Sequence, residues 1–87
     1  MTAVTLTLVG KPGCHLCDDA RAVVETVMTD EQLGSLDLTL HEQNILEDSA
    51  LFDRYHEEIP VLLIDGKVHN FWRIDPARLT AALKEKS

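Results

Sequence analysis

Basic residues, cysteines and long apolar runs are all scarce in this sequence. Lysine and arginine total 8 against 15 aspartates and glutamates, for a net charge of -7. Nucleic acids and anionic membranes are bound through clustered basic residues, so this balance argues against both partners. No apolar run approaches the roughly 20 residues of a membrane span, and the N-terminus lacks the basic and cleavable segments of a secretory signal. We therefore expect a cytoplasmic protein.

The chain has only two cysteines. That number is too small for the disulfide framework of a secreted mini-domain. Its 87 residues, 45% of them hydrophobic, are expected to form a single domain over residues 1–87. In a reducing compartment a close cysteine pair is more often catalytic or metal-binding than structural. The segment around the pair is therefore the first place to look for function.

Alternating and periodic apolar residues predict an α/β chain in the order βαβαββα. Strands are expected over residues 4–9, 36–41, 61–64 and 67–72, and helices over residues 14–28, 49–57 and 76–83. The helix between the first two strands makes those strands parallel. Asp65-Gly66 predicts a type I′ hairpin between the last two strands. Asp75 and Pro76 predict the cap and first position of the final helix.

Both cysteines lie where the first strand gives way to the first helix, in the segment Lys11–Cys17. Unpaired N–H groups and the positive end of the helix dipole favour a thiolate at such a position. The thiolate is the reactive form of cysteine. The placement of Cys14 and Cys17 therefore predicts thiol-disulfide chemistry.

Two other interpretations of the pair were weighed. The cysteines could be small residues packed on one helix face. They could also bind zinc, which needs four ligands. The remaining candidates form no recognisable ligand spacing with the pair, so no metal site is predicted and most of them are expected to be ordinary surface or strand residues: His15, His41, His56 and His69.

The element order, with Cys14 and Cys17 after the first strand and Pro60 at the start of the third, resembles the minimal, glutaredoxin-sized form of the thioredoxin fold over essentially the whole chain. The sequence is most similar to glutaredoxin-like proteins with a Pro-Gly-Cys-x-Leu-Cys opening, here Pro12–Cys17, and an Ile-Pro-Val-Leu segment, here Ile59–Leu62. The resemblance implies a four-stranded mixed sheet with helices on both faces.

The resemblance also implies roles for individual residues. Cys14 would attack a disulfide as the thiolate, and Cys17 would resolve the mixed disulfide. Pro60 would follow a cis peptide bond, so that the backbone at Ile59 and Pro60 could pair with an extended substrate beside Cys14. Lys11 would contact the carboxylate of glutathione, as the corresponding lysine does in dithiol glutaredoxins.

The segment after the last strand departs from the family pattern. Glutaredoxins usually have a Gly-Gly pair and a downstream acid there, which cradle the γ-glutamyl end of glutathione, whereas this chain has Trp72, Arg73 and the helix cap Asp75. Arg73 either binds an anionic substrate or forms surface ion pairs. Because adjacent strand residues point to opposite faces, one of Phe71 and Trp72 is expected in the core.

Side chains near the cysteines have opposing electrostatic effects. As a cation, His15 would stabilise the Cys14 thiolate, whereas Asp18 and Asp19 would destabilise it. The sequence does not fix the net direction. Farther along, the aromatic residues of the second helix, Phe52 and Tyr55, are assigned to the core.

The expected function is a thiol-disulfide oxidoreductase of glutaredoxin-like type, acting in cell redox homeostasis as a monomer. Its substrates would be disulfides of proteins or small thiols. It would need no tightly bound cofactor, with glutathione or another low-molecular-weight thiol as co-substrate and a reductase or thiol pool for recycling. The alternative is a binding module without turnover, which either docks a protein or bridges an iron-sulfur cluster through Cys14 and an external thiol.

Overall fold

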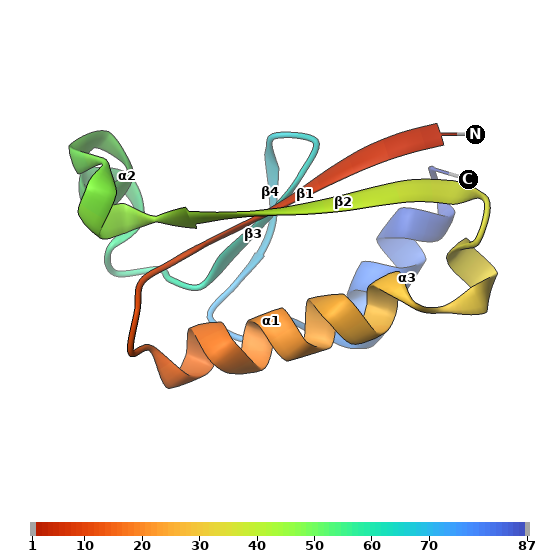
Figure 1. The fold of residues 1–87 in the computed structure, drawn as a ribbon, viewed down its shortest axis with the longest axis horizontal. Helices are drawn as coiled ribbons and strands as arrows, with labels where there is room; N and C mark the ends of the chain where they lie inside the picture. Colours follow the sequence, from red (N-terminus) through yellow and green to blue (C-terminus); the bar gives the residue numbers. More distant parts are fainter. Residues whose placement is uncertain (1, 87) are drawn as a thin grey trace.

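The computed structural model describes residues 2–86, and Figure 1 shows how its strands and helices alternate along the chain. Two short 3-10 helices, which the sequence did not predict, lie in the connections. In chain order the elements are β1 (Thr2–Gly10), α1 (His15–Met28), η1 (Glu31–Leu33), β2 (Leu36–Asn44), η2 (Ile45–Glu47), α2 (Ser49–Tyr55), β3 (Val61–Ile64), β4 (Lys67–Phe71) and α3 (Pro76–Lys84). The predicted order βαβαββα is therefore confirmed.

The four strands form one mixed sheet in the order β2-β1-β3-β4. β1 and β2 are parallel, as the connecting helix requires, while β3 runs antiparallel to both β1 and β4. Val9 lies opposite Val61 in the β1–β3 pair. The end of β1, which leads to the cysteines, and the start of β3, which follows Pro60, therefore meet at the same edge of the sheet.

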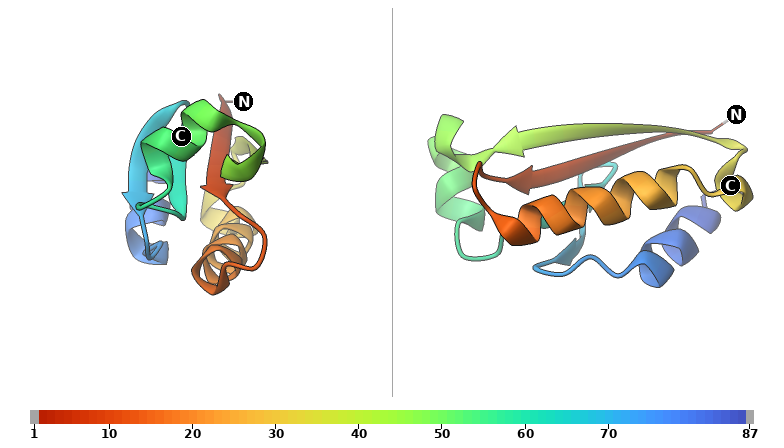
Figure 2. Two further views of the ribbon diagram at one scale, coloured as in Figure 1. Left: turned by 90° about the vertical axis from the view of Figure 1, so that its left-hand side faces the viewer. Right: turned by 60° about the horizontal axis from the view of Figure 1, so that its bottom comes forward.

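Helices cover both faces of this sheet, as predicted. Figures 1 and 2 show α1 and α3 along one face and α2 at one end of the other. Side chains of alternate strand positions point to opposite faces, and the buried residues divide accordingly. Leu8 and Leu62 belong to the larger cluster with α1 and α3, whereas Val9 and Val61 pack with Tyr55 of α2.

The predicted helix starts and the hairpin are also confirmed. The Asp48 and Asp75 carboxylates accept backbone N–H groups in the first turns of α2 and α3, which caps each helix. Asp65 and Gly66 have φ angles of 50° and 84°, as a type I′ turn requires. Residues close together in the sequence thus determine where α2 and α3 begin and where the chain turns between β3 and β4.

Two predictions about core aromatic residues were wrong. Phe71 and Trp72 are both exposed, at 41% and 54%, because the strand ends at Phe71 and Trp72 has a positive φ of 64° that breaks the alternation of faces. Phe52 is exposed and stacks on the His56 ring, whereas Tyr55 is buried as predicted. These aromatic side chains leave apolar surface near the sheet edge where the cysteines lie.

β2 is longer than its alternating pattern suggested. The predicted strand ended at His41, but pairing continues as far as Asn44, which lies opposite Gly10. Continuous pairing with β1 holds these last polar residues in the strand. As a result, the polar end of β2 lies beside the chain segment that leads into the cysteine pair.

Candidate functional site around Cys14 and Cys17

Cys14 is the N-cap of α1. Its backbone is extended, with φ -97° and ψ 112°, and its sulfur accepts the N–H of Cys17 at 3.2 Å. A hydrogen bond of this kind is stronger to a thiolate than to a neutral thiol. Cys14 is partly exposed. The more accessible of the two sulfurs therefore sits at the positive end of a 14-residue helix.

Cys17 is buried one turn further into the helix, with only 2% of its surface exposed. Burial raises the pKa of its thiol from 9.0 to about 11, and the hydrogen bond with Cys14 and the nearby Asp18 carboxylate act in the same direction. A backbone hydrogen bond from Lys11 opposes this shift. Cys17 is therefore a buried thiol that stays neutral near neutral pH.

The Ile59–Pro60 peptide bond is cis, the geometry that the resemblance implied. Pro60 is buried, and its carbonyl oxygen accepts the backbone N–H of Trp72 at 2.8 Å. The indole N–H of Trp72 also donates to the Glu57 carbonyl oxygen at 3.1 Å. Trp72, which directly follows β4, is thus hydrogen-bonded to both ends of the segment Glu57–Pro60, called the proline loop below.

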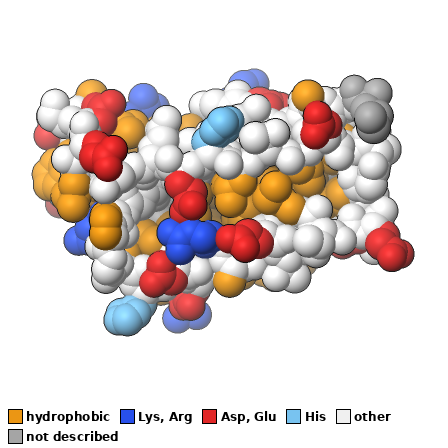
Figure 3. Space-filling view, viewed as in Figure 1, with side chains coloured by type: hydrophobic (Ala, Val, Ile, Leu, Met, Phe, Trp, Pro, Cys, Tyr) orange, Lys and Arg blue, Asp and Glu red, His pale blue; other side chains and the backbone are white. Residues whose placement is uncertain are grey.

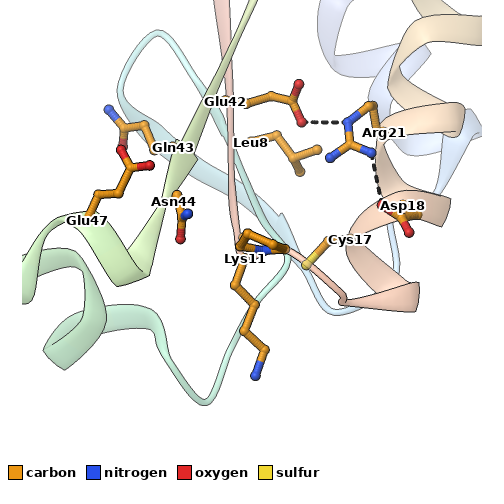
Figure 4. Close-up of a pocket in the computed structure, with 11 residues that line it drawn as sticks. Leu8, Lys11, Cys17, Asp18, Arg21, Glu42, Gln43, Asn44 and Glu47 are labelled. Carbon is orange, nitrogen blue, oxygen red and sulfur yellow. Dashed lines mark hydrogen bonds and ion pairs between the residues drawn. The ribbon is translucent and has the colours of Figure 1, made fainter.

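A pocket of about 410 Å³ lies beside Cys17, between the first turns of α1 and the end of β2. Figure 4 shows Arg21 between Glu42 and Asp18 at this pocket. Arg21 belongs to α1 and Glu42 to β2, so this pair connects the cysteine helix to the sheet edge. Figure 3 shows hydrophobic side chains gathered between β2 and α1 on this face, beside a basic group with acidic neighbours.

The other predicted site residues occupy different positions around the pair. Lys11 lines the pocket beside Cys17, but Figure 4 shows its side chain extending away from Arg21 and the two acids that Arg21 contacts. His15 is exposed at the first position of α1. Arg73 lines a second pocket with Leu16, on another part of α1's surface. The structure therefore brings Lys11 close to Cys17 and places Arg73 in a separate cavity.

Three participants in this site were missed in the sequence. Gly10 was interpreted only as the end of a strand, although its lack of a side chain makes room for Cys17. Arg21 is four residues after Cys17, a spacing that places both on one helix face and could have indicated their proximity. Glu42 carried no such signal, because only the register of β2 brings it to α1.

Residues 2–86 also lack two features that would point to other kinds of site. No helix in this range has the length and apolar character needed to cross a membrane. The same residues contain no group of three or more His, Cys, Asp or Glu side chains arranged to hold a metal ion.

Comparison with solved structures shows a thioredoxin fold. A structural-genomics target protein from X. campestris superposes with a TM-score of 0.73 at 28% identity, covering 94% of this chain and 99% of that one. A mutant thioredoxin from Halobacterium salinarum gives a TM-score of 0.64 at 22% identity, covering 98% of this chain and 75% of that one. A thioredoxin fold with a Cys-x-x-Cys pair is consistent with a redox function and suggests an oxidoreductase.

Sequence comparison gives the family. A glutaredoxin-like protein of Dictyostelium discoideum is 27% identical over 79 residues, covering 88% of this chain and 72% of that protein. The glutaredoxin-like domain family (DUF836) matches residues 5–84, which include both cysteines and the cis proline. The chain therefore belongs to the glutaredoxin-like domain family.

Proposed function

We propose that this protein is a dithiol oxidoreductase that exchanges its Cys14–Cys17 pair with substrate disulfides. The observation that carries the proposal is the difference between the two sulfurs. Cys14 is accessible and caps α1, whereas Cys17 is buried with a pKa raised to about 11. An exposed nucleophile and a protected second thiol are suited to the two successive steps of such an exchange.

In the first step the Cys14 thiolate attacks one sulfur of the substrate disulfide. The substrate S–S bond breaks, the other substrate sulfur leaves as a thiolate, and a mixed disulfide forms on Cys14. In the second step Cys17 loses its proton and attacks the Cys14 sulfur. The second substrate thiol leaves, so the substrate gains two electrons and the protein holds a Cys14–Cys17 disulfide.

The cycle closes when an external thiol reduces this internal disulfide. Glutathione or another low-molecular-weight thiol is the proposed co-substrate, with a reductase or thiol pool supplying the electrons, and no tightly bound cofactor is needed for the exchange. Lys11, Ile59 and Pro60 are the proposed substrate contacts, and His15 would stabilise the thiolate when protonated. We place the protein in the cytoplasm, because exchange of this kind requires a reducing partner, and propose that it acts as a monomer.

The test is a turnover assay with a small disulfide, comparing glutathione with thioredoxin reductase as the source of electrons. Cys14→Ser should abolish turnover, whereas Cys17→Ser should accumulate a mixed disulfide that mass spectrometry detects at Cys14. Turnover that survives Cys14→Ser would contradict the proposal. A coloured dimer after anaerobic purification, without turnover, would instead support cluster bridging through Cys14.

A further inference from the structure

A second pocket, of about 200 Å³, lies between α1 and the segment that follows β4. α1 contributes Leu16, Ala20 and Val23, and the other side contributes Trp72 and Ile74. The three α1 residues are spaced by four and three positions, so they lie on one face of the helix. This apolar stripe starts at Leu16, between the two cysteines, and therefore begins at the reactive end of α1.

The apolar side chains that line this pocket differ in their exposure to solvent. Ala20 and Ile74 are buried, whereas Leu16 and Trp72 remain 41% and 54% exposed. Removing apolar surface from water is favourable. A ligand that covers the Leu16 and Trp72 side chains would therefore bind more tightly than one that leaves them in water.

Trp72 is held in an unusual conformation. Its φ is 64°, and the Arg73 N–H donates to the Phe71 carbonyl oxygen at 2.9 Å, so the chain makes a γ-turn of the strained, positive-φ form. Such a conformation is rare and unfavourable for a non-glycine residue. The bonds to Pro60 and Glu57 hold it in place. Strain maintained by surrounding contacts is typical of functional sites, and here it gives the pocket a preformed side.

The charged residues of the pocket are one acid and one base. Asp19 and Arg73 both line it, and within residues 2–86 neither forms a salt bridge. Together they add no net charge, so the pocket as a whole does not select for a ligand of one sign. A peptide group matches them better, because its N–H can donate to a carboxylate and its C=O can accept from a guanidinium.

We propose that this pocket binds a large aliphatic or aromatic side chain next to the reacting cysteine of a protein substrate. The inference rests on the proposed function, because it names the substrate class of the Cys14 exchange. Peptide groups beside that side chain would meet Asp19 and Arg73. The γ-glutamyl arm of glutathione carries an ammonium and a carboxylate, which would also find partners in Asp19 and Arg73, but it has no apolar side chain to cover Leu16 and Trp72. Because only the protein side chain covers these two residues, the site favours protein disulfides over glutathione disulfides.

The test compares short synthetic peptides that have one cysteine in a disulfide with a chromogenic thiol. The peptides are identical except for leucine or serine directly before, or directly after, the cysteine. For the wild-type protein, kcat/KM should be at least tenfold higher for leucine in one of the two positions. The ratio of leucine to serine should fall to about threefold or less in Leu16→Ala. It should be unchanged in the control Leu46→Ala, whose side chain is exposed outside the pocket.

A second measurement does not depend on turnover. Trp72 is the only tryptophan in the chain, so its fluorescence reports directly on the pocket. In Cys17→Ser carrying a trapped mixed disulfide, the leucine peptide should change the emission and the serine peptide should not. If the leucine and serine peptides react equally while exchange with a small disulfide persists, the pocket proposal is overturned and the proposed function stands. If no disulfide reacts at all, both proposals fall.

Discussion

Gly10 and Cys17 lie so close together that a β-carbon on Gly10 would be 2.8 Å from the Cys17 sulfur and 3.2 Å from its β-carbon. Gly10 is not among the residues with positive φ, so the position requires glycine for space and not for its conformational freedom. The end of β1 therefore forms part of the wall that buries the second thiol.

Gly10→Ala should force Cys17 out of its position. Extra atoms in a packed interior typically cost 1–3 kcal/mol, so we expect the free energy of unfolding in urea to fall by about that amount. The mixed disulfide on Cys14 should also last longer, because the displaced Cys17 attacks it less readily. Gly34→Ala is the matched control: its added β-carbon meets only the Glu31 carbonyl oxygen, at 3.2 Å, and should leave the mixed-disulfide lifetime unchanged. Equal lifetimes in Gly10→Ala and wild type would argue against this role.

Alkylation should distinguish the two thiols. Because burial raises the pKa of Cys17 from 9.0 to about 11, its thiolate fraction near neutral pH is about 100-fold below that of an ordinary cysteine. In Cys14→Ser, iodoacetamide should therefore label Cys17 very slowly at neutral pH and about tenfold faster per pH unit on the alkaline side. Cys17→Ser supplies the comparison at Cys14. Labelling of Cys17 at the rate of a free peptide cysteine would refute its protected state.

His69 should make the protein less stable in mild acid. Burial, followed by the nearby Arg78 charge, lowers the pKa of His69 in the folded state, and its Nε2 is buried without a hydrogen-bond partner within residues 2–86. The unfolded chain then takes up the proton first as the pH falls below about 6.5. The free energy of unfolding should therefore decrease as the pH falls from about 6.5 to the lowered pKa of His69 in the folded state.

The measurement for His69 is the urea midpoint at pH 7.5 and pH 5.0. His69→Phe should weaken the dependence on pH, whereas substitution of the exposed His41 by glutamine should leave it as in the wild type. The slope should stay well below the ~1.4 kcal/mol per pH unit of one fully titrating group, because part of the side chain meets solvent. Identical pH profiles for His69→Phe and wild type would show that another group is responsible.

The conformation of Trp72 can be tested by comparing two small replacements. Trp72→Gly and Trp72→Ala both remove the indole bond to Glu57, but only glycine relieves the positive φ of 64°. Urea unfolding should therefore find the glycine variant more stable than the alanine variant by about 1 kcal/mol. At Val68, an exposed strand residue without positive φ, the order should reverse. The same order at both positions would mean that Trp72 is not strained.

Most of the fold could be predicted because its signals are local. Alternation located the first two strands, a continuous apolar run the third and the Asp65-Gly66 turn the fourth, while helical spacing and capping residues located the three α-helices. Asp48 and Asp75 set helix starts through bonds to neighbouring residues. The extension of β2 to Asn44 could not be predicted, because it depends on pairing with β1. The exposure of Phe71 and Trp72 was also missed, since a tryptophan with positive φ has no sequence signature.

The sequence by itself determined that two thiols lie at the start of a helix, because Cys14 and Cys17 are neighbours in one helical turn. Only the tertiary structure decided how the thiols differ. Cys17 is buried against Gly10, the polar end of β2 carries Glu42 to Arg21, and Trp72 is attached to the proline loop. These contacts join residues far apart in the chain, so they depend on sheet register and on packing, which no local pattern encodes.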